Sequence, residues 1–331
     1  MNSFGRIFRI HIFGESHGEC VGLTIDGCPA GLPLQVEDFL EDIERRKGGV
    51  QKGTTPRKED DIPIFKTGMF NGHTTGAPLT ILFENKNTRS GDYEKQVAVP
   101  RPGHSDFTAH AKYGGFQDYR GGGHFSGRLT VCLVAAGVIA KKLLAQIDVK
   151  STILEIGGET DLEKGLDKAI AAKDSIGGIV ECRVNGLPVG LGEHFFDSVE
   201  SLISHVVFAI PAVRGVEFGT GFNAAKMFGA DHNDAIEDAT GKTRTNHAGG
   251  VVGGITNGNE LVFRVAIKPT SSTPKEQQTW NRDTGKVENF SVKGRHDLCI
   301  ALRVPVVLEA VTAMVLTDLM LLNQTIKPVL L

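Results

Sequence analysis

VPVVLEAVTAMVLTDLMLL, residues 304–322, decides the fold, because it is apolar on almost every side of a helix. A second stretch of this kind, LTVCLVAAGVIAKKLLA, spans residues 129–145. Helices that are apolar all round belong between the layers of a protein rather than on its surface. The first stretch also carries Glu309 and Asp318, which favours a buried core helix over a membrane span.

Several other segments alternate apolar and polar residues with the period of two that indicates a half-buried strand. Strands with one dry and one wet face are typical of antiparallel sheets. We expect such strands at residues 6–13, 21–26, 79–84, 179–184 and 261–267.

Two further helices are expected to be amphipathic. One covers residues 36–49 and ends at Gly48-Gly49, and the other covers 197–210 and is capped by Asp197. The predicted fold is therefore α+β, a β-α-β sandwich of antiparallel sheets packed around a helical core. Neither a linker-like stretch nor an internal repeat divides the chain, so we expect one domain over residues 1–331.

Composition narrows the class of protein. The chain is 40% hydrophobic with a net charge of −3, so it has no overall field that would attract nucleic acid or a membrane. Its N-terminal residues lack the apolar core of a signal peptide. The five cysteines are scattered without a C-x-x-C pair, which predicts free thiols, no structural zinc and a cytoplasmic location.

Glycine is unusually frequent, with 41 in 331 residues against the usual ~7%. The glycines cluster beside polar residues, as in GESHGE, YGGFQDYRGGG and NHAGGVVGGITNG. Tight turns explain part of this pattern. The rest is typical of backbone that approaches a ligand closely.

Two stretches gather cations. Residues 44–58 hold six basic side chains against Glu44, more than a helix dipole needs, and residues 101–128 combine arginines with three histidines. A solvated charged face is the alternative interpretation, but arginine forks suit carboxylate and phosphate groups. We expect an anion site. Gly121–Gly123 precede a helix and would offer N–H donors to phosphate or to a flavin edge.

Two histidines stand out as proton-transfer groups. His17 lies between glycines at the end of a strand, and His104 follows Arg101-Pro102-Gly103. The sequence around His17 matches G-x-S-x-G, but a strand rather than a helix follows it, which disfavours a hydrolase elbow. His104, Asp106 and His110 form H-x-D-x-x-x-H, so a metal-dependent phosphohydrolase remains an alternative. An anion- or nucleic-acid-binding module built on residues 44–58 is another.

Together these motifs resemble the chorismate synthase family. The resemblance runs in the family's order from FRIHIFGESHG through RRK, TTPR, TTGAP and RPGHSDFTAHAKYGGFQDYRGGG to IPAVRGVEFGTGF, NHAGGVVGGITNG, KPTSS and GRHDLC. It implies a lyase that converts 5-enolpyruvylshikimate 3-phosphate to chorismate and phosphate by 1,4-anti elimination. It also implies reduced FMN without net redox change, a β-α-β sandwich fold and a homotetramer.

The resemblance also implies roles for particular residues. His17 and His104 match proton donors to the leaving phosphate and to the reduced flavin, and Asp297 matches an aspartate near flavin N5. Substrate-binding residues would be Arg45, Arg46, Lys52, Arg101 and Arg128. Cofactor-binding residues would be Arg46, His124, Phe125, Ser126, Pro211, Ala212, Gly253, Lys268, Pro269, Thr270, Ser271, Ser272 and Arg295.

This sequence departs from the commoner family pattern where it reads GGGHFSGRLT. Many members have arginine at the position of His124 and serine at that of Phe125, so Arg128 is expected to supply the missing charge. Some members reduce FMN with NADPH. No added reductase domain is evident here, so an external flavin reductase or reductant is expected.

Overall fold

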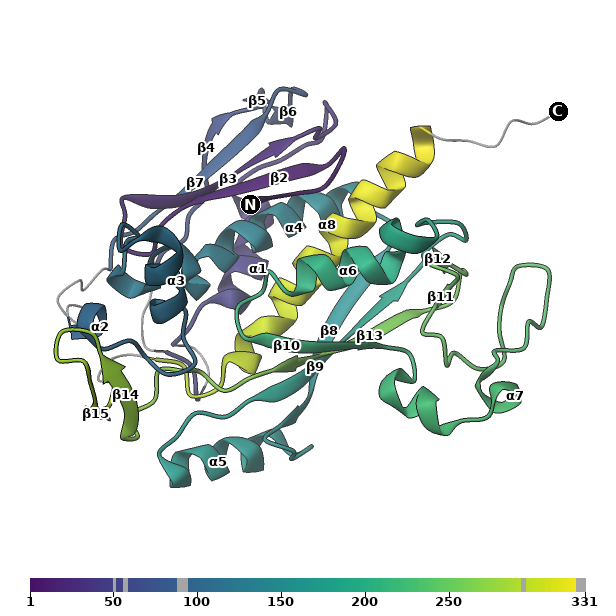
Figure 1. Ribbon diagram of the computed structural model, residues 1–331. Coiled ribbons are helices and arrows are strands. Elements are labelled where there is room, and N and C mark those ends of the chain that lie inside the picture. Colours follow the sequence, from purple (N-terminus) through teal and green to yellow (C-terminus); the bar gives the residue numbers. More distant parts are fainter. Residues whose placement is uncertain (50–51, 56–58, 88–94, 293–295, 326–331) are drawn as a thin grey trace.

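The computed structural model describes residues 1–49, 52–55, 59–87, 95–292 and 296–325. Two antiparallel sheets enclose a layer of helices, as Figure 1 shows with the first sheet at the top. The α+β sandwich expected from the sequence is confirmed.

The first sheet has the strand order β1-β2-β3-β7-β4. Its inner face is built by alternation: Val21, Leu23 and Ile25 of β3 are fully buried, and β7 buries its apolar residues in the same way. The strands are β1 (Ser3–Phe4), β2 (Arg9–Gly14), β3 (Cys20–Asp26), β4 (Ile64–Thr67) and β7 (Leu79–Glu84).

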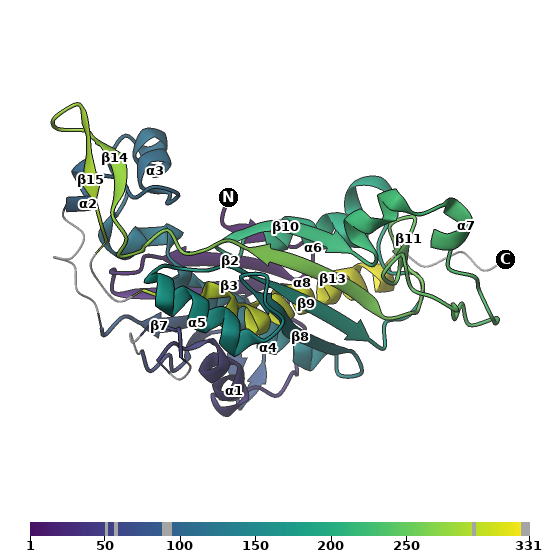
Figure 2. The same ribbon diagram turned by 90° about the horizontal axis from the view of Figure 1, so that it is seen from below.

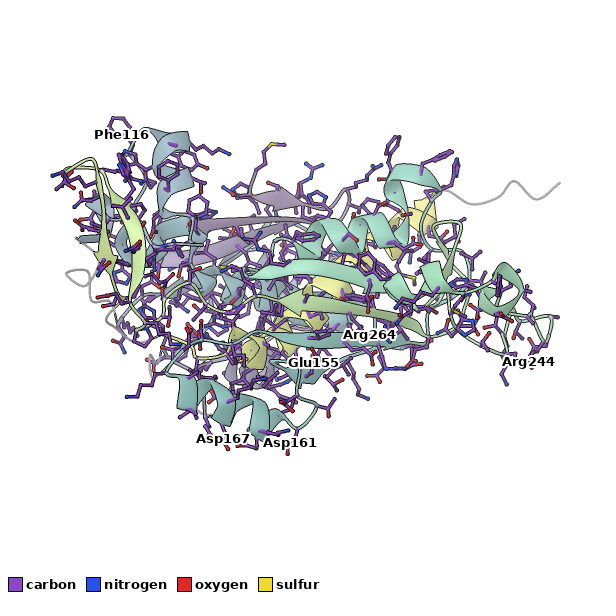
Figure 3. All side chains as sticks on the ribbon, turned by 60° about the horizontal axis from the view of Figure 1, so that its bottom comes forward. Phe116, Glu155, Asp161, Asp167, Arg244 and Arg264 are labelled. Carbon is purple, nitrogen blue, oxygen red and sulfur yellow. The ribbon has the colours of Figure 1, made fainter. Side chains whose placement is uncertain are left out.

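The second sheet has the order β10-β13-β9-β8. Its inner face is apolar, and its outer face carries ion pairs such as Arg264 with Glu181 at 2.8 Å; Figure 3 shows Arg264 on this wet side. The strands are β8 (Asp148–Ile156), β9 (Gly178–Asn185), β10 (Val213–Phe218) and β13 (Leu261–Ile267).

Four helices lie between the sheets, and the two views in Figures 1 and 2 agree on this layer. They are α1 (Glu37–Arg46), α4 (Thr130–Leu143), α6 (Val199–Val207) and α8 (Val304–Thr325). Helices α4 and α8 correspond to the two apolar stretches and pack directly on each other. A Cβ added to Gly137 of α4 would lie only 2.3 Å from the Cβ of Ala310, so glycine sets this close approach.

The two acidic residues of α8, Glu309 and Asp318, are buried, and both carboxylates accept hydrogen bonds. The Asp318 carboxylate accepts the backbone N–H groups of Arg6, Ile7 and Phe8, which ties the first sheet to the helix. Glu309 accepts both terminal nitrogens of the Arg45 guanidinium at 2.8 Å. By length and composition, Ile300–Gln324 could cross a membrane, but 83% of its most apolar window is buried inside the protein, as in a core helix.

The remaining elements surround the sandwich. The β14–β15 hairpin lies beside α2 and α3 at one end of the molecule, and α7 lies at the other (Figure 1). They are β5 (Met69–Phe70), β6 (His73–Thr74), α2 (Lys95–Ala98), α3 (Asp106–Tyr113), η2 (Arg120–Phe125), η3 (Gly127–Leu129), α5 (Leu162–Ala172), η4 (Phe195–Asp197), η5 (Gly221–Lys226), α7 (Gly229–His232), β11 (Val251–Val252), β12 (Ile255–Thr256), β14 (Gln277–Asn281), β15 (Lys286–Phe290) and η6 (Ile300–Arg303).

The helix cap expected at Asp197 is wrong. Ser198 caps α6 by accepting the N–H of Ser201, while Asp197 pairs with Arg6. Helix α3 was not expected, because its short polar sequence carries little apolar periodicity. It supplies a residue of the site described next.

The contact between α4 and α8 predicts that Gly137→Ala destabilises the protein. Alanine normally favours a helix over glycine by about 1 kcal/mol, but here overpacking costs about 1–3 kcal/mol. Urea unfolding should show a lower midpoint. The control is Ala171→Gly in the exposed last turn of α5, where glycine should be the less stable residue. A stabilised Gly137→Ala variant would contradict the close contact.

Candidate active site

A cavity of about 540 Å³ opens at one end of the helical layer. The first turns of α4 and α8 line it, as do the last residues of α1 and the segment after α6. Helix N-termini favour anions because their first N–H groups and the helix dipole point outwards. The position of the cavity therefore suits negatively charged ligands.

The lining is apolar on its floor and strongly basic around it. The floor includes Ile12, Leu133, Ile210, Ile300, Val304 and Val307. The charged lining residues are Arg46, Lys47, Arg101, Arg128, Lys268 and Arg303, with Glu59, Asp61 and Asp297 as the carboxylates. His104, His124 and His296 also line the cavity.

Three consecutive glycines, of which Gly121 lines the cavity, form a glycine wall beside it. Gly121, Gly122 and Gly123 have φ values of 61°, 82° and 53°, which side chains rarely adopt. A Cβ on Gly121 would lie 2.6 Å from His17 Nε2, and one on Gly122 would lie 3.6 Å from His104 Nε2. The glycine wall thus brings the two predicted proton-transfer histidines together: His104 lines the cavity, and His17 is buried behind Gly121.

The expected N–H cradle at this wall is only partly free. The N–H of Gly122 donates to Tyr119 O, and that of Ser126 donates to Gly123 O. The N–H of Arg128 donates to the Ser126 hydroxyl at the start of η3. These three donors are used within the loop, so side-chain cations remain the main anion-binding groups.

Asp61 joins two of the cationic residues. Its carboxylate accepts Arg46 at 2.8 Å on one oxygen and a short hydrogen bond from Arg128 on the other. The residue is buried and has a left-handed φ of 52°, a conformation that aspartate tolerates better than most side chains. Burial opposes ionisation of Asp61, but the two guanidinium groups outweigh it, and the pKa of this carboxyl lies below its ordinary value.

Arg46 is the most deeply buried of the cavity cations. Burial lowers the pKa of its guanidinium to about 10, so it stays charged at neutral pH. It donates to Asp61 and to the Thr130 hydroxyl, while its Nε has no hydrogen-bond partner among the described residues. A buried donor without a partner is costly and indicates a place for a ligand acceptor or water.

Arg101 is engaged with the protein rather than exposed to a ligand. It forms a two-pronged pair with Asp106 at 2.7 and 2.8 Å, and its remaining nitrogen donates to the Ser272 hydroxyl at 3.1 Å. Asp106 also lies 2.6 Å from His104 Nδ1. The arginine expected to bind substrate therefore organises a neighbouring histidine.

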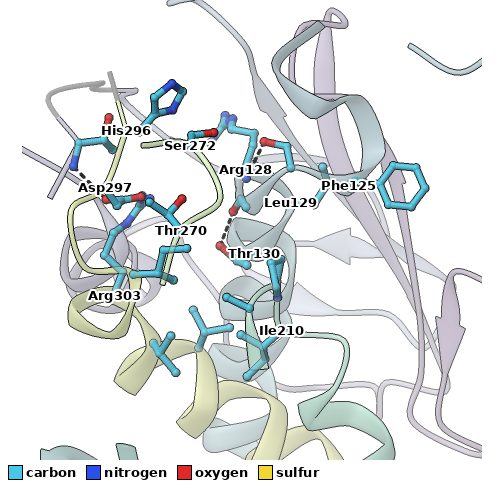
Figure 4. Close-up of a pocket in the computed structure, with 18 of the residues that line it drawn as sticks. Phe125, Arg128, Leu129, Thr130, Ile210, Thr270, Ser272, His296, Asp297 and Arg303 are labelled. Atoms are coloured by element: carbon cyan, nitrogen blue, oxygen red, sulfur yellow. Dashed lines mark hydrogen bonds and ion pairs between the residues drawn. The ribbon is translucent and has the colours of Figure 1, made fainter. Parts of the chain in front are cut away.

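Asp297 is fixed on both oxygens. One accepts the Thr55 N–H at 2.9 Å, and the other accepts Arg303 at 3.0 Å. Figure 4 shows Asp297 and Arg303 together at the cavity, close to Thr270. Arg295, predicted to contact the cofactor, lies outside the described residues.

The KPTSS loop forms a rim of hydroxyl groups and one cation. Lys268 Nζ donates to Ser271 Oγ at 2.8 Å, and Ser271 Oγ donates to Gly103 O. Burial, followed by the charge of Arg214, lowers the pKa of Lys268. Of this loop, the predicted residues Lys268, Thr270, Ser271 and Ser272 line the cavity, and so do Pro211 and Ala212 of the segment after α6.

Of the two departures from the family pattern, His124 has a structural role. His124 Nδ1 lies 2.8 Å from Gly14 O, and its Nε2 lies 3.1 Å from Asn2 Oδ1, so the ring tethers the glycine wall to the first sheet. Phe125 is half exposed and points away from the other residues in Figure 4. Arg128 lines the cavity as expected, but all its nitrogens bond to Asp61, Asn85 and Glu84 O.

Some predicted site residues do not line the cavity. Arg45 faces Glu309, and Lys52 pairs with Glu163 and Asp167 of α5, the latter labelled in Figure 3. Gly253 follows β11 in a hairpin turn at the opposite end of the molecule, far from the cavity (Figure 1). Pro269 also stays outside the lining, although its neighbours on both sides are part of it.

Sequence reasoning missed several residues that matter. Asp61 and Arg303 lie at the cavity, yet each sits in a stretch without a distinctive spacing of its own. Asp106 was identified from the sequence only as a possible metal ligand, whereas the structure pairs it with Arg101 and His104. The available signal was the excess of basic residues in two stretches of the sequence, because buried cations require carboxylates nearby.

The metal alternative is not supported. No group of three or more His, Cys, Asp or Glu residues that could hold a metal forms within the described part of the chain. In the H-x-D-x-x-x-H motif, Asp106 instead bonds to Arg101 and His104.

An α+β sandwich with a basic cavity, an apolar floor and two histidines at a glycine wall defines an enzyme that acts on a small, multiply charged anion. A family model described as "Chorismate synthase" matches residues 8–321. The chain belongs to the chorismate synthase family, a family of carbon–oxygen lyases.

Individual relatives agree over nearly the whole chain. A chorismate synthase of Chitinophaga pinensis is 73% identical over 325 residues, covering 98% of both chains. One of Methanocaldococcus jannaschii is 39% identical, covering 99% of this chain and 98% of its own. A crystal structure titled as a chorismate synthase matches with a TM-score of 0.72 at 26% identity, covering 96% of this chain and 93% of that chain.

Asp61 provides a test of the charge arrangement. Asp61→Asn keeps the shape but leaves two buried arginines without a counter-charge, which should cost about 3–5 kcal/mol of unfolding free energy at neutral pH. Because the folded-state pKa is depressed, this stabilisation is present above the ordinary value of 3.8 and is lost as the pH falls below it. Urea unfolding of both proteins from pH 7 to pH 3 measures the difference. A difference that does not change with pH would contradict the assignment.

Proposed function

We propose that the chain eliminates phosphate from 5-enolpyruvylshikimate 3-phosphate to give chorismate, with the 540 Å³ basic cavity as the active site. The observation that carries this assignment is the gathering of six basic side chains around an apolar floor. The substrate carries two carboxylates and a phosphate on a small ring. Such charges enter a buried site only when cations meet them.

The family supports a flavin in general, and we propose reduced FMN in particular. The residues present fit it: an apolar floor suits a flat ring system, Lys268 and the hydroxyls of Thr270, Ser271 and Ser272 suit a phosphate-bearing tail, and Arg46 Nε offers an unpaired donor. When bound, the reduced flavin supplies an electron-rich ring beside the substrate. No redox change results from the overall reaction.

The chain's own groups would bind the substrate and handle protons. Phosphate leaves C3 while a hydrogen leaves C6, so charge grows on the phosphate oxygens as the bond breaks. Arg46 and its neighbours would stabilise this charge, and a proton donor adds about 10²–10⁴-fold. We assign that proton transfer to His104 and His17, which flank the glycine wall, and propose Asp297 as a third proton carrier held by Arg303 and Thr55.

Several finer points accompany this proposal. We propose a single domain over residues 1–331, a cytoplasmic location, and an external flavin reductase or other reductant as the source of electrons. For the remaining predicted residues, Lys52 and Arg45 would have to change partners to reach substrate, since acids of α5 and α8 hold them. Gly253 and Pro269 would need contacts that the isolated chain does not make at this cavity.

The test of the function is an anaerobic assay. The protein is mixed with 5-enolpyruvylshikimate 3-phosphate and dithionite-reduced FMN, and chorismate and phosphate are followed together. Equal yields, obtained only with reduced flavin, are expected, and His104→Gln should lower kcat by about 10²–10⁴-fold. Phosphate without chorismate would indicate a phosphohydrolase. Neither product from folded, FMN-binding protein would overturn the proposal.

We also propose a homotetramer, supported by exposed phenylalanines between η4 and α7. Phe196, Phe222 and Phe228 are 91%, 82% and 81% exposed, and large aromatic residues are enriched at interfaces. A Phe196→Glu/Phe228→Glu variant should dissociate in size-exclusion chromatography with light scattering. Phe116→Glu is the matched control, since Phe116 is 95% exposed and lies at the opposite end from Arg244 (Figure 3). A monomeric parent protein would contradict the proposed assembly.

A further inference from the structure

We propose that Asp106 is a positioning residue that holds the His104 ring with its proton on Nδ1 and leaves Nε2 facing Gly122 of the glycine wall. This rests on the proposed function insofar as His104 transfers a proton. The contact that carries it is the 2.6 Å distance between Asp106 Oδ1 and His104 Nδ1.

The tautomer follows from the partners of Nδ1. Arg101 Nη2 also lies 3.0 Å from Nδ1 and could donate to it if that nitrogen were unprotonated. The lone pair of an unprotonated Nδ1 would then face a carboxylate oxygen 2.6 Å away, which is repulsive. A proton on Nδ1 turns the shorter contact into a charge-assisted hydrogen bond. Nδ1 is therefore the donor and Asp106 the acceptor.

Asp106 is itself held rigidly. Arg101 donates to Oδ2 from Nε at 2.7 Å and from its backbone N–H at 3.1 Å, and to Oδ1 from Nη2 at 2.8 Å. The side chain is only 14% exposed. Burial opposes its ionisation, but the hydrogen bonds from Arg101 and His104 outweigh burial and keep the pKa of Asp106 far below its ordinary value. The carboxylate stays charged at any pH at which the enzyme would work.

The opposite edge of the ring is left open. A Cβ on Gly122 would lie 3.5 Å from His104 Cε1 and 3.6 Å from Nε2, so any side chain there would cover this edge. Gly122 has φ 82° and carries none. The arrangement matches the way a buried aspartate orients a catalytic histidine in other enzymes, where the carboxylate fixes the tautomer and never takes the proton.

The Asp106→Asn variant distinguishes a role of Asp106 in orienting His104 from a role in packing alone. The amide has the same shape, but one of the two oxygen sites becomes an NH2 group. The Oδ2 site accepts two donors of Arg101 that cannot reverse, whereas the Oδ1 site accepts one such donor and the His104 ring, which can change tautomer. The NH2 group therefore settles at the Oδ1 site, Nδ1 becomes the acceptor, and the ring proton moves to Nε2.

The measurement is the ¹⁵N spectrum of histidine-labelled protein, with the His104 signals assigned by their loss in His104→Gln. The parent protein should show His104 protonated on Nδ1, and Asp106→Asn should show it protonated on Nε2. In the assay with reduced FMN, kcat should fall about 10²–10⁴-fold with KM nearly unchanged. Asp106 does not line the cavity and so makes no substrate contact to lose.

Asp42→Asn is the matched control. Asp42 has the same 14% side-chain exposure and an arginine partner, Arg45, but is paired with Arg45 and Lys141 and not with a histidine. It should leave the His104 spectrum and kcat unchanged. The proposal is overturned if the parent protein has His104 Nδ1 unprotonated, a result that does not require the variant to fold. It is also overturned if folded Asp106→Asn keeps its kcat, or loses it with the tautomer unchanged. Failure of the function itself would appear separately, as a parent protein without chorismate formation.

Discussion

The contact of α4 with α8 at Gly137 and Ala310 is the constraint on which the rest of the structure depends. Both helices start at the cavity, with Thr130 and Val304 in its lining. Their spacing thus fixes the distance between Arg46, which donates to Thr130, and Arg303, which precedes α8. A packing requirement in the middle of the core therefore sets the geometry of a charged site at its end.

Four arginines of the cavity are paired with carboxylates of the protein itself. Asp61 holds Arg46 and Arg128, Asp106 holds Arg101, and Asp297 holds Arg303. Pairing avoids the large cost of isolated buried charge and keeps the guanidinium groups in place. An anion that binds here would therefore add hydrogen bonds to existing ion-pair networks. The binding free energy gained would depend on donors that the protein leaves unused, such as Arg46 Nε.

The sequence predicted the architecture because its physical causes are local. Continuous apolar sequence identified α4 and α8, and alternation identified β2, β3, β7, β9 and β13, since burial in a sandwich requires those patterns. Clusters of charge and glycine located the basic segments together with His17 and His104, and the family resemblance added a role for Asp297. Partner choice could not be predicted in the same way. Whether Arg45 meets substrate or Glu309, and whether Lys52 reaches the cavity or α5, depends on contacts between residues distant in the chain.

The hydrogen bonds of Asp318 have a consequence for how the protein is made. This carboxylate binds the amide of Arg6 across a separation of 312 residues. During synthesis the first strands leave the ribosome long before α8 exists. Forming this contact then costs the conformational entropy of closing a loop of about 300 residues, which the hydrogen bonds offset only once they are made. Helix α4 packs on β2 and β3, but the amides of Arg6, Ile7 and Phe8 lack their acceptor until the last helix emerges. A truncation within α8 that removes Asp318 would therefore leave these three amides without their acceptor.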